Sequence, residues 1–198
     1  MDIYQCAEQY WVAQLADQCK REIQDCIQRP FNYIEVFGYS KLIQLEYVYN
    51  TTLSIIATEF ETVVKDKNFM LLTAEELTHF LHKADSILID ELTLFKTLEK
   101  WASRQCKLKY KSTSGEDKRQ ELGQLLFQVR IPLIPLQTFS DEIVGTGILT
   151  NHEQLTLFKY YSGVEKSTTS VCGFCLKPRR EKVETDNGNK KRSYIANW

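Results

Sequence analysis

Apolar residues recur at intervals of three and four positions along most of this chain, and this period constrains its fold more than any other feature. The first stretch shows it in Ile3, Cys6, Ala7, Tyr10 and Trp11, which would share one face of a helix. Alternating apolar and polar residues, which indicate strands, are nearly absent. The pattern predicts an all-α protein, built from antiparallel helix pairs that follow one another along the chain.

Polar residues with capping preferences mark where several of these helices should begin. Thr73 with Glu76, and Thr150 with Glu153, have capping-box spacing: the threonine hydroxyl accepts from a backbone N–H and the glutamate reaches back. Asp90 can cap the next long helix. The same signals predict a surface loop over 111–118 and short helices over about 136–143 and 150–161.

Charge is unevenly distributed along the 198 residues, whose formal net charge is −1. From Ser162 onward, eight Lys or Arg residues face four Asp or Glu residues, whereas the preceding part has 17 against 22. The composition predicts a basic, flexible tail. The small net charge argues against a nucleic-acid partner, although the clusters at 177–180 and 190–192 could also be nuclear-import or nucleic-acid patches.

Three features bear on the location of the protein. No run of about 18 apolar residues occurs, and the start, Met1-Asp-Ile-Tyr-Gln, lacks the basic and apolar regions of a signal peptide. Four of the six cysteines, Cys6, Cys19, Cys26 and Cys106, fall on apolar helical faces, where free thiols pack as small hydrophobic groups. We expect a cytoplasmic protein with reduced cysteines and no membrane partner.

The densest set of polar residues lies between positions 79 and 101. His79 and His82 could supply two zinc ligands, with Asp85, Asp90 or Glu91 as a third. Helical geometry places both histidines opposite the apolar face of their helix, which favours a solvent-exposed position. Adjacent Asp90 and Glu91 do not face each other, which favours roles at a helix start over acid–base chemistry. We therefore predict no metal site, no cofactor and no enzymatic activity, and expect Asp85 to hold a turn through side-chain-to-backbone hydrogen bonds.

Cys172 and Cys175 form the sharper candidate for chemistry. C-x-x-C spacing serves both thioredoxin-like redox sites and half of a four-ligand zinc site. No strand is predicted before the pair and no second C-x-x-C follows. A linker thiol pair is the favoured interpretation, with a zinc- or thiol-dependent regulatory protein as the alternative.

Several stretches carry the pattern of a known family. The segments are IYQCAEQYWVAQLADQC (3–19), NFMLLTAEELTHFLHKADSILIDELTLFKTLEKWA (68–102) and LLFQVRIPLIPLQTF (125–139). The first resembles the last helices of a BTB domain and the adjoining three-box region, and the others resemble the BACK domain that follows BTB domains. The signature residues of that domain correspond here to Leu77, Phe80, Leu81, Asp85, Ile87, Glu91, Phe95 and Trp101. The stretch DEIVGTGILTNHEQLTLFKYYSG is further similar to BTB-BACK proteins that carry a PHR domain rather than Kelch repeats.

The resemblance implies end-of-BTB and three-box-like helices over 1–30, a BACK-like helical domain over 31–162 and the basic flexible tail over 163–198. Proteins of this kind usually act as substrate adaptors for cullin-RING ubiquitin ligases. We expect protein partners, a cullin and a substrate, and a homodimer only where a BTB core is supplied; a truncated scaffold without cullin binding is the alternative.

Exposed aromatic residues are the best candidates for partner contacts, because they bury a large area at interfaces. The candidates, all from the first two predicted helix pairs, are Tyr10, Trp11, Phe31, Tyr33 and Phe37. The alternative is that most of them fill the core.

Overall fold

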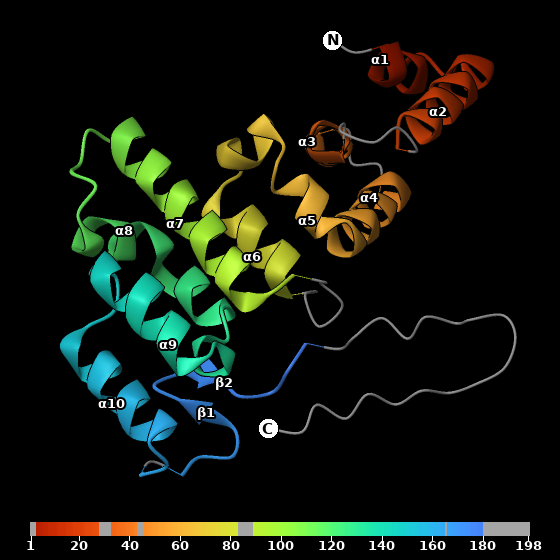
Figure 1. Cartoon of the computed structure of the whole chain (residues 1–198). Helices are drawn as coiled ribbons and strands as arrows, with labels where there is room; N and C mark the ends of the chain where they lie inside the picture. The colour runs from red at the N-terminus through yellow and green to blue at the C-terminus, as the bar shows by residue number, and fades with distance from the viewer. Residues whose placement is uncertain (1–2, 28–32, 43–45, 83–88, 165, 180–198) are drawn as a thin grey trace, which may run out of the picture.

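The computed structural model describes residues 3–27, 33–42, 46–82, 89–164 and 166–179. Figure 1 shows helices that follow one another from an N-terminal hairpin at one end of the molecule to α10 at the other. The α-helices are α1 (Ile3–Gln9), α2 (Ala13–Ile27), α3 (Tyr33–Leu42), α4 (Glu46–Thr58), α5 (Phe60–Val63), α6 (Ala74–His82), α7 (Glu91–Leu108), α8 (Gly115–Leu122), α9 (Leu136–Thr138) and α10 (Asn151–Tyr161). The predicted all-α class is confirmed.

Shorter elements connect the helices. Within the described residues, four are 3₁₀ turns, η1 (Lys67–Leu71), η3 (Gly123–Gln128), η4 (Ile131–Leu133) and η6 (Val144–Thr146), and one is a π turn, η5 (Phe139–Ile143). Two short strands, β1 (Ser170–Val171) and β2 (Phe174–Cys175), pair antiparallel. Among the residues that the structure describes, no helix is both long enough and apolar enough to span a membrane.

One continuous core runs from α3 to β2. Its largest fully buried side chains are the phenylalanines at 37, 60, 69, 80, 95, 139 and 174. The α1–α2 hairpin has a separate small cluster, made of Tyr4, Ala7 and Ala16. Aromatic edge-to-face contacts, such as Phe37 with Phe80 at 4.6 Å between ring centroids, add specificity to this packing.

Helix α7 contributes a long buried face to the core. Its buried face includes Leu94, Phe95, Leu98, Trp101 and Ala102, the apolar stripe that its 3.6-residue period predicts. The Trp101 indole N–H donates to the Leu72 carbonyl oxygen at 2.9 Å, so the one polar group of this buried side chain is satisfied. This bond ties α7 to the end of η1.

The predicted helix starts are confirmed. The Thr73 hydroxyl accepts from the Glu76 N–H at 3.2 Å while the Glu76 carboxylate accepts from the Thr73 N–H at 2.9 Å. Thr150 and Glu153 form the same reciprocal pair at α10. The Asp90 carboxylate accepts from the Thr93 N–H at 2.9 Å. Local capping chemistry therefore fixes where α6, α7 and α10 begin.

Glu153 also has a long-range partner. Burial alone would raise the pKa of its carboxyl, but a bidentate ion pair with Arg119, at 2.8 Å for both N–O contacts, and the bonds from Thr150 hold that pKa below its ordinary value. Burial raises the pKa of the Tyr161 phenol well above its ordinary value, and this hydroxyl donates to the Ile131 carbonyl oxygen at 2.8 Å. Both groups link α10 to the rest of the core.

Two predicted local boundaries were partly wrong. The loop expected over 111–118 ends at Ser114, which caps α8 through the Asp117 N–H. The short helix expected over 136–143 is instead one α turn followed by a π turn. Gly115, the first residue of α8, lies against the backbone of Gly147: a Cβ on Gly115 would sit 2.2 Å from the Gly147 carbonyl carbon, so this position requires glycine.

The C-terminal segment differs from the predicted flexible tail over residues 166–179. Val171 and Phe174 are buried in the main core, and Phe174 packs on Phe127 with 5.1 Å between ring centroids. Figure 1 shows this hairpin beneath α9 and beside α10. Residues 180–198 lie outside the described residues, and the division at residues 30 and 162 stays a prediction.

Candidate protein-interaction surfaces

The turn between α1 and α2 presents two aromatic side chains to solvent. Tyr10 and Trp11 are 71% and 91% exposed. The turn is closed by the Val12 N–H, which donates to the Ala7 carbonyl oxygen at 2.8 Å, and Trp11 has a positive φ of 56°. This left-handed conformation is unfavourable for a bulky residue. We call Tyr10, Trp11 and Val12 the aromatic turn.

The other predicted aromatic candidates are placed differently. Phe37 is 1% exposed and belongs to the core. Its prediction as an interface residue is wrong, because its ring packs against Tyr49 and Phe80. Tyr33 is half-buried and packs against the main core. Phe31 lies outside the described residues. The aromatic turn therefore carries the two exposed members of the predicted set among the described residues.

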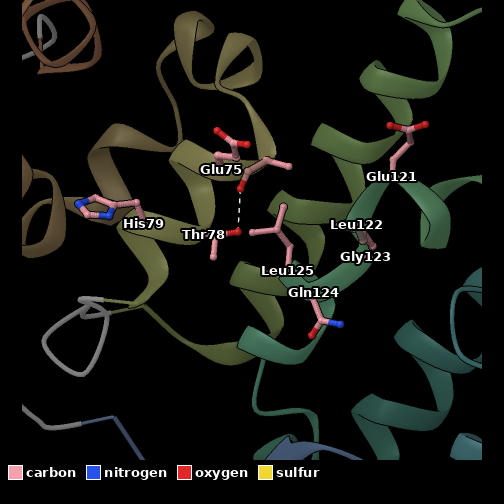
Figure 2. Close-up of a pocket in the computed structure, with 9 residues that line it drawn as sticks. Glu75, Thr78, His79, Glu121, Leu122, Gly123, Gln124 and Leu125 are labelled. Carbon is pink, nitrogen blue, oxygen red and sulfur yellow. Dashed lines mark hydrogen bonds between the residues drawn. The ribbon is translucent and has the colours of Figure 1, made fainter. Parts of the chain in front are cut away.

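A groove of about 420 Å³ lies between α6 and the junction of α8 with η3 (Figure 2). Ala74 and Thr78 line one side, and Leu122 and Leu125 line the other, so the lining is mainly apolar. Its volume falls within the range of ligand sites, but the groove is open to solvent. Its shape suits an apolar side chain of a protein partner better than an enclosed substrate.

Two of the polar side chains around this groove, Thr78 and Glu121, are engaged elsewhere. The Thr78 hydroxyl donates to the Ala74 carbonyl oxygen at 2.7 Å (Figure 2). Figure 2 shows Glu121 pointing away from the groove, and its carboxylate is bound by Lys109 at 2.5 Å and Lys111 at 3.0 Å. Lys109 above all holds the pKa of Glu121 below its ordinary value. The Thr78 hydroxyl and the Glu121 carboxylate are therefore both committed to contacts within the protein.

Of the two histidines in the predicted pair, only His79 has a side chain among the described residues. His79 is exposed, as predicted, and its ring centroid lies 5.9 Å from that of Tyr49. The side chain of His82 and the whole of Asp85 fall outside the described residues, so the predicted turn contacts of Asp85 stay a prediction. No group of three or more His, Cys, Asp or Glu side chains within the described ranges could hold a metal ion.

The cysteine pair lies on the hairpin. Cys172 and Cys175 are free thiols. Cys172 and Gly173 form the two-residue turn, with positive φ values of 50° and 86°, as in the tight turns that join twisted strands. Zinc or thiol chemistry stays a hypothesis here; about one bound zinc per chain, lost in C172S/C175S, would support it.

A buried ion pair fastens the segment after the hairpin to the start of α7. Arg179 donates through Nε to Glu91 Oε1 at 2.8 Å, with side chains 8% and 12% exposed. It also donates to the Gln128 carbonyl oxygen at 2.8 Å, while Glu91 accepts from the Arg130 N–H at 2.9 Å. We call this arrangement the Glu91–Arg179 clasp. Neither the clasp nor the hairpin before it was expected from the sequence. The hairpin could have been found, because Val171 and Phe174 flank a Cys-Gly pair, which is a short hairpin signal.

Comparison with known proteins identifies a family model and relatives that match most of this chain. A family model described as "BACK: BTB And C-terminal Kelch" matches residues 33–143. BTB/POZ domain-containing protein 6-A of Danio rerio is 24% identical over 160 residues, which is 81% of this chain and 29% of the relative. BTB/POZ domain-containing protein 3 of Homo sapiens is 24% identical over 160 residues, covering 81% and 30%. The chain thus spans about three tenths of the length of these relatives. No solved structure matches the chain significantly.

Proposed function

Because this chain belongs to the BACK family, a family of protein-interaction adaptors, we propose that it is a non-enzymatic module of a substrate adaptor for a cullin-RING ubiquitin ligase. In this proposal the α1–α2 hairpin contributes to cullin contact, and the helices from α3 onward form the rigid body that separates the cullin from a substrate-holding part. We further propose that the protein acts in the cytoplasm.

The aromatic turn is the observation that carries this proposal. Its two exposed aromatic rings project from a hairpin that has its own small cluster of buried residues and precedes the family match at 33–143. Large aromatic side chains left in water are unfavourable for an isolated chain, and Trp and Tyr dominate the energetic centres of protein interfaces. A partner that covers the aromatic turn would remove both exposed rings from water.

A pull-down of the full chain with a panel of purified cullins tests the proposal. The same chain joined behind a BTB core of a BTB/POZ relative is tested alongside it, because this chain spans only part of its relatives. We expect one cullin to be retained and Trp11→Ala to weaken its binding by about 30-fold, the effect of losing an interface hot spot. Tyr47→Ala removes another exposed tyrosine, on α4, and should leave binding unchanged.

Two results would count against the proposal. If neither form retains any cullin, the adaptor role fails, and a scaffold without cullin binding becomes the better description. If a cullin binds but Trp11→Ala and Tyr47→Ala behave alike, the aromatic turn is not the contact. Light scattering adds a separate check, since we expect a homodimer only for the form that carries the BTB core.

A further inference from the structure

The outer face of α7 carries three cations that have no partner within the part of the chain that the structure describes. Lys100, Arg104 and Lys107 are exposed, and at about 100° per residue they fall within about 60° of arc on the side opposite the buried stripe. Among the residues that the structure describes, their side chains make no hydrogen bond or ion pair. We call these three residues the α7 basic stripe.

Other cations close to the stripe along the chain are paired. Lys96 binds Glu142 at 3.0 Å and Lys118 binds Glu99 at 2.8 Å, while Lys109 and Lys111 share Glu121. Like charges spaced three or four residues apart repel one another on a helix, as Lys100 with Arg104 and Arg104 with Lys107 do here. The helix C-terminus accounts for Lys107, which lies in the last turn, but not for the other two.

Tyr110, just beyond the stripe, adds an independent observation. It is 100% exposed and has a positive φ of 55°. The next N–H, of Lys111, donates to the Cys106 carbonyl oxygen at 2.9 Å, so Tyr110 takes the left-handed position after a helix where glycine is favoured. A tyrosine here is conformationally unfavourable, and its side chain stabilises no core.

We propose that the α7 basic stripe and Tyr110 form a docking surface for an acidic segment of another protein. The three cations span about 10 Å along the helix axis, at 1.5 Å per residue, which matches three or four residues of an extended chain. A run of Asp and Glu residues pairs with the cations, and the Tyr110 hydroxyl donates a further hydrogen bond to a carboxylate.

Charge complementarity favours an acidic protein segment over nucleic acid. Residues 1–161 contain 17 basic and 22 acidic residues, and this net negative charge disfavours the approach of a long polyanion. Nucleic-acid binders typically neutralise about six or more phosphates, and a stripe of three cations is too short for that. A short run of Asp and Glu residues contacts only the α7 basic stripe and not the rest of the surface.

Fluorescence anisotropy at low salt tests this docking surface with the full chain. The probe is a labelled peptide of eight glutamates, compared with a glutamine peptide of the same length, a 12-nucleotide single-stranded RNA and a DNA duplex. We expect K100Q/R104Q/K107Q to bind the glutamate peptide about tenfold more weakly, because exposed ion pairs contribute little individually. The matched control, K67Q/K159Q/K166Q, removes three exposed lysines elsewhere and should change binding less than twofold.

Tyr110→Gly separates docking from folding. Glycine relieves the left-handed backbone, so this variant should melt at a higher temperature yet bind the glutamate peptide at least threefold more weakly. The proposal is overturned if both triple variants lose binding equally, if RNA or DNA binds more tightly than the peptide, or if the peptide does not bind at millimolar concentration. None of these measurements involves a cullin, so the outcome is independent of the adaptor proposal.

Discussion

Replacing Phe174 by alanine should destabilise the whole helical array, although this residue lies beyond the last helix. Phe174 is fully buried, its ring lies 5.1 Å from that of Phe127, and β2 packs on η3 and η4. Truncation of a buried phenylalanine to alanine costs about 3–5 kcal/mol in other cores. Because a two-stranded hairpin can partly collapse into the vacated space, we expect a value near 3 kcal/mol.

The free energy of unfolding lost in Phe174→Ala has an upper limit, because the hairpin lies near the end of the described chain. The hairpin contributes a certain free energy to the stability of the fold. If Phe174→Ala costs more than this free energy, residues 166–179 detach and the remaining helices stay folded. The free energy lost cannot then exceed the loss caused by deleting everything after Val164. The hairpin's own contribution includes the Glu91–Arg179 clasp, so the truncated chain should be less stable than Phe174→Ala.

Urea and thermal denaturation, followed by circular dichroism at 222 nm, measure both effects. A loss of about 3 kcal/mol corresponds to a fall of about 6–12 °C in Tm for a domain of this size. Val164→Ala is the matched control, since Val164 is exposed in the same segment and should change stability by less than about 0.5 kcal/mol. The reasoning is refuted if deletion after Val164 leaves Tm within about 1 °C, because the hairpin would then contribute nothing to the fold.

Three further predictions can be checked by the same denaturation assays. Gly115→Ala should destabilise by more than about 2 kcal/mol because its Cβ meets backbone, whereas Gly38→Ala, with open space around it, should stabilise α3 by up to about 1 kcal/mol. The pKa of Glu153 is lowered in the folded protein, so its ionised carboxylate stabilises the fold above about pH 4.3 and this stabilisation is lost as pH falls through the folded pKa. Glu153→Gln should therefore make the free energy of unfolding less dependent on pH in the acid range. The pKa of Tyr161 is raised in the folded protein, so its neutral phenol stabilises the fold fully below about pH 10 and this stabilisation is lost as pH rises. Tyr161→Phe should therefore make the free energy of unfolding less dependent on pH in the alkaline range.

Features that depend on neighbouring residues could be predicted from the sequence. The capping boxes at Thr73 and Thr150, and the Asp90 cap, each need residues only three positions apart. The apolar stripe of α7 is similarly encoded by its own 18 residues. Such local patterns give helix starts and buried faces because the helix itself brings these residues together.

The faces of α3 could not be predicted in the same way. Ile34, Val36, Phe37 and Ser40 are all buried, and they point in several directions around the helix, so periodicity does not say which aromatic side chain remains exposed. The sequence pattern therefore allows Phe37 as an interface candidate, whereas in the structure it fills the core. The exposed face of Tyr10 and Trp11 depends instead on the turn that ends α1 at Gln9, which a continuous helical pattern through Trp11 concealed.

Glu91 shows why the C-terminal contacts escaped prediction. An acidic residue in the first turn of a helix has a sufficient local explanation in the helix dipole, so nothing in the neighbouring sequence required another partner. Its carboxylate nevertheless binds Arg179, 88 residues later, and the Arg130 N–H. A buried carboxylate with one of these donors removed would be poorly compensated, so the start of α7, the η3–η4 connection and the segment after the hairpin are held as one unit. The chain consequently reaches residue 179 at a fixed place beside α7, which local composition, read as a basic tail, could not reveal.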